Sequence, residues 1–219
     1  MKKKWILGSR GSRLALIQTD IVRSQLASLY PEADFETRII KTTGDSTWNT
    51  PLYQIGQKGL FVKEIEEALV NGEIDFAVHS MKDLPSELAG GLVLGAILER
   101  EDPRDVLVSN RFASLDVLPD GALIGTSSMR RQSQLLAFNG TFEIVPLRGN
   151  VDTRIRKLRE QNLDGIVLAW AGVNRMGFSH QVSQVLPLDL MVPACGQGAI
   201  GVETRDEKEL VELLGPLNH

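Results

Sequence analysis

Four short segments of the sequence place polar and charged residues where a strand or an apolar run ends. The first, residues 9–12, reads SRGS and contains Arg10 and Ser12 just before a helical pattern. Backbone N–H groups at the start of a helix are unpaired and attract anions, and a guanidinium adds a fork of hydrogen-bond donors. Capping of the helix by Ser12 explains the same residues equally well. The segment is therefore a candidate carboxylate or phosphate site, or a helix cap.

Residues 125–131, with the sequence GTSSMRR, are a stronger candidate for the same chemistry. Thr126, Ser127 and Ser128 precede Arg130 and Arg131 at the predicted start of another helix. A cap needs only one hydroxyl, so three in a row favour an anion cradle over plain capping.

Residues 147–154, with the sequence LRGNVDTR, carry two further arginines. Arg148 stands at a predicted strand end, and Arg154 falls in the first turn of the next helix. A cation at that end opposes the helix dipole, so an anionic ligand would account for Arg154. The cations that follow, Arg156, Lys157 and Arg159, fit a solvated helix face.

Residues 78–85, with the sequence VHSMKDLP, offer a different chemistry because a carboxylate follows a strand closely. Lys82 beside Asp83 keeps the carboxylate ionised, so Asp83 could stabilise a developing cation or accept a hydrogen bond from an N–H group. Taken alone, the loop is more readily explained as a surface ion pair, and His79 as a packed, hydrogen-bonded histidine.

The composition excludes several classes of protein. The 219 residues include 24 Lys and Arg against 28 Asp and Glu, with one cysteine and three histidines. We therefore expect neither a disulfide framework nor a metal site. Seven cationic and two acidic side chains lie between residues 126 and 159, which favours a small polycarboxylate or phosphate ligand over nucleic acid. No apolar stretch suits a signal peptide or a membrane span, so we expect a soluble, cytoplasmic protein.

Hydrophobic spacing predicts alternating strands and helices that would position these segments. The predicted strands are residues 5–8, 35–40, 75–79, 122–125, 142–147 and 165–169, and the predicted helices are 14–29, 59–71, 129–138 and 151–161. This alternation is typical of parallel sheets covered by helices, an α/β fold. Residues 100–105 and 186–188 are charged or proline-marked and are candidates for crossings between two lobes.

Nine segments, in order along the whole chain, resemble those of the hydroxymethylbilane synthase family, also called porphobilinogen deaminase. They are GSRGSRLAL (8–16), KTTGD (41–45), QKGLFVKEIE (57–66), DFAVHSMKDLP (75–85), EREDPRD (99–105), GTSSMRRQSQL (125–135), LRGNVDTR (147–154), LAWAGVNRMG (168–177) and PACGQGAIGVE (193–203). The resemblance implies two lobes like those of type II periplasmic binding proteins, with a ligand cleft between them. Lobe one would comprise residues 1–98 and 193–219, and lobe two residues 99–192.

The resemblance also implies the chemistry of tetrapyrrole and heme biosynthesis. The family condenses four porphobilinogen molecules into hydroxymethylbilane and releases ammonia at each step. Asp83 would hydrogen-bond pyrrole N–H groups and stabilise the cationic azafulvene left by ammonia. The residues expected to bind substrate or cofactor are Arg10, Ser12, Lys58, Phe61, Lys82, Thr126, Ser127, Ser128, Arg130, Arg131, Arg148, Arg154 and Gln197.

One part of the family pattern does not match. Members start polymerisation on a dipyrromethane cofactor, which a thioether joins to a cysteine in a third domain, and that attachment cysteine is absent here. Cys195 lies in PACGQGA instead. It is either a small buried residue beside a tight glycine loop or a substitute anchor for the primer.

Three interpretations of this mismatch remain open. The chain could be active without a third domain, could be completed by a separate C-terminal domain polypeptide, or could be a fragment that only binds. The alternative from another class is a non-catalytic module that holds a tetrapyrrole or another polycarboxylate. Against that alternative stands Asp83, because an anion binder gains nothing from a carboxylate facing its ligand.

Overall fold

The computed structural model describes residues 4–43 and 62–219, which form two compact units. Unit 1 comprises Met1–Arg100 and Ala199–His219, and unit 2 comprises Glu101–Gly198. The chain thus passes from one unit to the other at residues 100/101 and returns at 198/199. Residues 186–188 lie inside unit 2, where Leu186 is fully buried.

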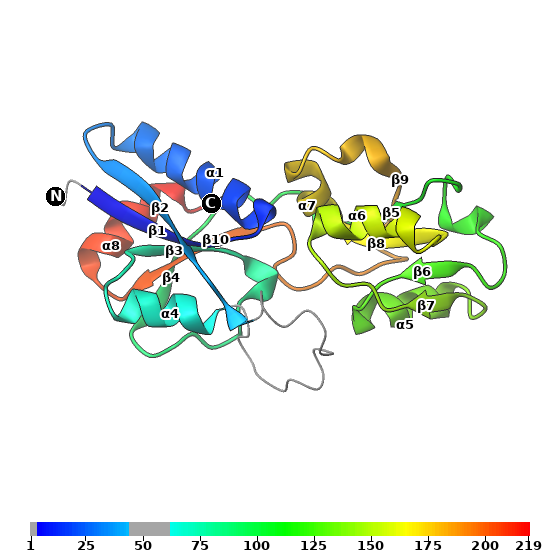
Figure 1. The fold of residues 1–219 in the computed structure, drawn as a ribbon. Coiled ribbons are helices and arrows are strands. Elements are labelled where there is room, and N and C mark those ends of the chain that lie inside the picture. The colour runs from blue at the N-terminus through cyan, green and yellow to red at the C-terminus, as the bar shows by residue number, and fades with distance from the viewer. Residues whose placement is uncertain (1–3, 44–61) are drawn as a thin grey trace. The chain divides into compact units, whose positions relative to one another are not determined.

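Unit 1 is built on a five-stranded mixed sheet (Figure 1). In spatial order the strands are β2 (Asp34–Ile40), β1 (Lys4–Arg10), β3 (Phe76–Ser80), β10 (Ile200–Arg205) and β4 (Leu92–Ile97). Strand β1 pairs in parallel with β2 and β3, whereas β10 pairs antiparallel with β3 and β4.

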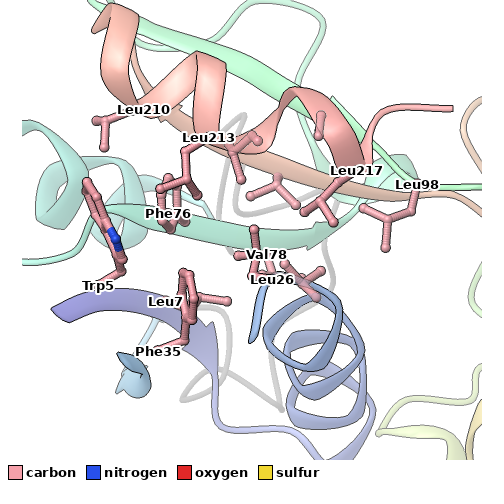
Figure 2. Packing of buried hydrophobic residues seen from close by; sticks show 14 of the residues in the cluster. Trp5, Leu7, Leu26, Phe35, Phe76, Val78, Leu98, Leu210, Leu213 and Leu217 are labelled. Carbon is pink, nitrogen blue, oxygen red and sulfur yellow. The ribbon is translucent and has the colours of Figure 1, made fainter. Parts of the chain in front are cut away.

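Helices cover both faces of this sheet. Helices α1 (Arg13–Leu29) and α8 (Lys208–Leu214), with the short turn η4 (Gly215–Leu217), pack on one face, and α4 (Lys63–Val70) packs on the other. The side chains of β3 alternate accordingly, because Phe76 and Val78 join the first cluster and Ala77 joins the second. Figure 2 shows Phe76 and Val78 packed among Trp5, Leu26 and Leu213.

Unit 2 repeats the plan with a second five-stranded mixed sheet. Its strands, in spatial order, are β7 (Glu143–Val145), β6 (Leu123–Gly125), β8 (Gly165–Ala169), β5 (Asp105–Val108) and β9 (Val182–Val185). Its helices are α5 (Met129–Phe138), α6 (Val151–Glu160) and α7 (Trp170–Arg175), with single turns η2 (Leu115–Val117) and η3 (Ser179–Gln181). Leu135 of α5 packs in one core cluster, and Ile155 and Leu158 of α6 pack in another.

The expectation of purely parallel sheets is wrong, because each sheet contains an antiparallel strand that has no helical crossover before it. Strand β10 follows the return from unit 2 and enters the first sheet between β3 and β4. Strand β5 follows the first crossing and runs antiparallel to β8 and β9. Among the described residues, no helix is long and apolar enough to span a membrane.

Candidate functional site

The Asp83 turn follows directly from the central strand β3 of unit 1. The single turn η1 (Met81–Asp83) succeeds Ser80, and the N–H of Leu84 donates to the carbonyl of Met81 at 3.3 Å. Asp83 is exposed. A carboxylate is thus held at the end of a buried strand with its side chain open to solvent.

Strand β10 holds the first residue of this turn. The N–H of Met81 donates to the carbonyl of Ala199 at 3.1 Å, immediately before β10. A Cβ atom at Gly201 would lie 2.4 Å from Sδ of Met81, so the missing side chain makes room for the methionine. The side chain of Met81, the first residue of the turn, therefore packs against β10, the strand that follows the return from unit 2.

Gln18 of α1 fastens the turn from the other side, and the sequence interpretation missed it. Its amide exchanges hydrogen bonds with the hydroxyl of Ser80 at 2.9 and 3.1 Å, and the residue is 4% exposed. Gln18 lies one helical turn after Leu14. A glutamine facing the core beside the apolar stripe of a predicted helix was the available signal.

The segment at residues 9–12 uses its hydroxyls locally. The Oγ of Ser12 accepts from the N–H of Ala15 at 3.2 Å and caps α1, while Ser9 is buried and donates to the carbonyl of Arg10 at 3.0 Å. Arg10 is half-buried at the end of β1. The capping interpretation of Ser12 is confirmed, and an anion at Arg10 stays a prediction.

The three hydroxyls before α5 also organise the backbone. Ser128 caps the helix by accepting from the N–H of Arg131, Thr126 accepts from the N–H of Ser128 at 3.2 Å, and Ser127 donates to the carbonyl of Leu147 at 3.1 Å. Of the three, only Ser127 is exposed. Their predicted contact with a ligand stays a prediction.

Arg130 and Arg131 share one buried carboxylate, that of Asp105. Oδ2 of Asp105 accepts from Arg130 at 2.7 Å, and Oδ1 accepts from Arg131 at 2.7 Å and from Gln197 at 2.9 Å. Burial opposes ionisation of Asp105, but the two guanidinium groups outweigh it and hold the pKa of the carboxyl below its usual range. The sequence interpretation missed Asp105, whose partners are 25, 26 and 92 positions away.

These contacts distinguish the two arginines. Arg131 is 6% exposed and also donates to the carbonyl of Val167 at 2.9 Å, so its donors serve the interior of unit 2. Arg130 keeps a quarter of its side chain exposed. Gln197 is 1% exposed and donates to the carbonyl of Pro103 at 2.6 Å. Of these three side chains, that of Arg130 is the most exposed, and it also donates to the carbonyl of Val192.

The loop at residues 147–154 has a special backbone conformation. Gly149 has φ of +126°, and a Cβ atom there would lie 2.6 Å from the side chain of Thr153. Nε of Arg154 donates to the carbonyl of Gly149 at 2.7 Å, and Lys157 donates to the carbonyl of Arg148 at 3.0 Å. Arg148 and Arg154 are both half-buried. One half-buried cation thus stands before α6 and another in its first turn.

The other cations of α6 divide between two settings. Arg156 is exposed and pairs with Glu160 at 3.2 Å, and Arg159 is exposed as well. Both fit the solvated face expected from the sequence, whereas Lys157 is half-buried against the loop before the helix.

Arg175 is a further cation that the sequence interpretation did not single out. It lies at the end of α7 and donates to the carbonyl of Gly198 at 2.8 Å, next to the return crossing. Burial lowers its pKa, while the charge of Glu101 acts in the opposite direction. Its position places another half-buried cation beside the segment that leads out of unit 2.

Cys195 is exposed, so the expectation of a small buried residue is wrong. The N–H of Gln197 donates to the carbonyl of Ala194 at 3.1 Å, closing a turn that sends Gln197 inward and leaves Cys195 outside. Attachment of the primer at Cys195 stays a prediction.

Two predicted binding residues, Lys58 and Phe61, lie outside the described residues, as do Gly44 and Asp45 of the KTTGD segment. Lys82 is exposed beside Asp83. Within residues 4–43 and 62–219, no group of three or more His, Cys, Asp or Glu could hold a metal ion.

Comparisons with known proteins place this geometry in context. The family described as "Porphobilinogen deaminase, dipyromethane cofactor binding domain" matches residues 5–212. Porphobilinogen deaminase of Syntrophomonas wolfei is 56% identical over 97% of this chain and 70% of its own length. That of Brevibacillus brevis is 54% identical over 96% of this chain and 69% of its own.

The similar solved structures include two that are described as methionine-binding. The methionine binding protein MetQ superposes with a TM-score of 0.58 at 14% identity, over 98% of this chain and 89% of that one. A methionine-binding lipoprotein of Bacillus subtilis gives 0.54 at 12% identity, over 99% of this chain and 90% of that one. At this identity the likeness concerns the fold alone. It confirms the expected α/β class with two lobes like those of type II periplasmic binding proteins.

Proposed function

Because the chain belongs to the porphobilinogen deaminase family, we propose that Asp83 is its catalytic carboxylate and that the arginines of unit 2 bind the substrate's acidic side chains. Family membership makes the protein a hydroxymethylbilane synthase, a transferase of tetrapyrrole biosynthesis, as expected from the sequence. The roles of its individual residues are our proposal, and so is its location in the cytoplasm.

The observation that carries the role of Asp83 is an exposed carboxylate on a firmly held turn. When ammonia leaves porphobilinogen, the C–N bond breaks and its electron pair stays on nitrogen. The pyrrole-methylene group that remains becomes cationic. A fixed carboxylate lowers the energy of that cation and accepts a hydrogen bond from the pyrrole N–H.

The carboxylates of the substrate need cationic partners, which unit 2 supplies. Arg130 and Arg131 bring two positive charges to one buried carboxylate, so one positive charge remains at the start of α5. Arg148 and Arg154 add two half-buried cations before and in the first turn of α6. Acetate and propionate groups fit such donors through paired hydrogen bonds.

The same donor set fits the dipyrromethane that the family description includes, since that group also carries acidic side chains. Arg130, Arg148 and Arg154 would hold its carboxylates. When bound, it supplies the pyrrole end to which substrate units are joined. Its covalent anchor would be Cys195 or a cysteine on a separate C-terminal domain polypeptide.

The test is porphobilinogen consumption by the purified chain, followed by oxidation of the product to a porphyrin. We expect turnover, and we expect Asp83→Asn to abolish it while porphobilinogen binding persists. Equal loss of binding and turnover in that variant would contradict the catalytic role of Asp83. No turnover by the folded chain, followed by turnover after addition of the remaining part of a relative, would identify a missing domain.

A second candidate, a non-catalytic tetrapyrrole or polycarboxylate binder, would use the same half-buried cations of unit 2, Arg130, Arg148 and Arg154. The Asp83→Asn variant distinguishes such a binder from an enzyme. For a pure binder, removing a negative charge that faces an anionic ligand strengthens binding and no turnover exists to be lost.

A further inference from the structure

Behind the Asp83 turn, the sheet of unit 1 buries a histidine and a glutamate in contact. Nε2 of His79 lies 2.9 Å from Oε2 of Glu203, and the two side chains are 4% and 0% exposed. In the β3–β10 ladder, His79 is opposite Gly201 and Glu203 is opposite Ala77. Both side chains therefore lie on the face of Ala77, which packs against α4.

Stability alone accounts poorly for this pair. Oε1 of Glu203 is buried and has no hydrogen-bond partner within the part of the chain that the structure describes. An ionised carboxylate is costly to bury, and apolar residues of similar volume often stabilise a fold as well or better. Strand β10 could carry an apolar side chain in place of Glu203, since five of the six residues of β10 are buried.

The position of the pair relative to Asp83 suggests what it does. His79 is the second-last residue of β3, and the next residues are Ser80 and the turn that ends at Asp83. Farther along, Oε1 of Glu66 on α4 accepts from the N–H of Ala89 at 3.2 Å. The chain around Asp83 is thus held at Met81 by the residue before β10 and at Ala89 by α4, and His79 precedes Met81 by two residues.

Other charged groups border the pair on the same face. Glu66 approaches from α4, and its pKa is raised by burial and by the charge of Glu203, against the effects of the Ala89 N–H and of His79. Arg205 and Asp75 form an ion pair at 3.5 Å at the opposite end of the same two strands. Arg10 ends the neighbouring strand β1. From β4, whose sequence is LVLGAI, no charged group faces the pair.

We propose that His79 and Glu203 are positioning residues for Asp83, because their hydrogen bond fixes the end of β3 from which the Asp83 turn departs. The proposal rests on the catalytic role of Asp83. A pair that crosses from β3 to β10 below the turn limits the rotation of the last β3 residues. Loss of the hydrogen bond lets Asp83 shift without removing any group that binds the substrate.

The first measurement is steady-state kinetics of His79→Leu and Glu203→Met, each of which removes one partner of the hydrogen bond. Because small displacements of a catalytic group reduce the rate strongly, each variant should lower kcat by about tenfold or more. Substrate binding depends on other residues, so KM should stay within about twofold. The double variant His79→Gln/Glu203→Gln instead places two neutral amides opposite each other, which can donate and accept, and it should keep most of the wild-type kcat.

A matched control separates positioning from general loss of stability. Thr204 is buried on the other face of β10, and its hydroxyl donates to the carbonyl of Asp75 at 2.8 Å. Thr204→Val removes a buried hydrogen bond from the same strand and should leave kcat unchanged. If Glu203→Met does not fold, Glu203→Asp keeps the charge but withdraws the carboxylate from His79, and the same fall in kcat is expected.

Hydrogen exchange of residues 80–90 provides a readout that does not require turnover. Exchange there should rise in each single variant, return toward the wild-type rate in the double variant, and stay unchanged in Thr204→Val and Asp83→Asn. Unchanged exchange and kcat in the folded single variants would overturn the proposal, as would equal losses in Thr204→Val. If Asp83→Asn instead retains turnover, the proposed catalytic role fails, and exchange still decides whether the pair holds the turn.

Discussion

Asp105 and Arg131 form an ion pair that is almost completely removed from solvent. Oδ1 of Asp105 lies 2.7 Å from Nη2 of Arg131, and the side chains are 0% and 7% exposed. Asp105 is the first residue of β5 and Arg131 the third of α5, so the pair joins the strand after the crossing to the helix that starts with the hydroxyl-rich segment. The start of α5, where we propose that an anion binds, is thereby fixed from inside unit 2.

Removing the carboxylate of Asp105 should destabilise unit 2 strongly. Asp105→Ala leaves the buried guanidinium of Arg131 without its counterion, which costs about 3–5 kcal/mol of unfolding free energy. Urea denaturation measures this loss. Arg156→Ala is the control, because it breaks an exposed pair with Glu160 and should change stability by less than about 1 kcal/mol. A similar small loss in both variants would mean that the buried pair contributes no more than a surface pair.

The same pair predicts how stability depends on pH. The folded pKa of Asp105 lies below its unfolded value of about 3.9, so the carboxylate stabilises the fold above that value. This contribution is lost as the pH falls through the lower, folded pKa. Urea unfolding between pH 6 and pH 3, values chosen to bracket about 3.9, should show a smaller acid loss for Asp105→Asn than for the wild type. Parallel pH curves would contradict the depressed pKa.

The fold was predictable where local patterns determine it. The bounds of α5 and β8 agree with the prediction, since a serine cap, a regular apolar spacing and a compact apolar run mark them in the sequence. Strands β5 and β10 were missed because each contains buried acidic residues, Asp105 and Glu203, in segments that offer no alternation. The burial of those carboxylates depends on partners far away in the sequence, which no local pattern reveals.

The site was predictable as a set of loops but not as a set of contacts. Arg130 became a candidate through its residue type and its place at the start of a helix, and Asp83 through the family resemblance; the roles of both stay predictions. That Arg131 and Gln197 turn inward follows from Asp105, whose role emerges only when β5, α5 and the return segment are assembled. Cys195, by contrast, was expected to be buried and is exposed. The general tendency of cysteine to be buried says nothing about the conformation of the turn that contains Cys195.

The thiol of Cys195 should react with a maleimide in the native chain as readily as in the denatured chain, because it is exposed. Mass spectrometry of intact protein follows the labelling. The same instrument tests the anchor hypothesis: a pyrrole adduct on the denatured wild type that disappears in Cys195→Ser supports attachment there. An adduct that persists in the variant eliminates Cys195 as the anchor.

Arg154 and Arg159 lie on the same helix and provide a matched comparison of a proposed binding cation with a solvated one. Arg154 is half-buried and hydrogen-bonded to Gly149, whereas Arg159 is exposed. Arg154→Gln should raise KM for porphobilinogen by about tenfold, because it removes an ion pair made equally in the ground and transition states, and kcat should remain near the wild-type value. Arg159→Gln should change neither constant. The melting temperatures of both variants should be measured as well, because loss of the hydrogen bond from Arg154 to Gly149 also destabilises the loop. A lower melting temperature of Arg154→Gln with unchanged KM would show that this arginine only supports the loop and binds no carboxylate.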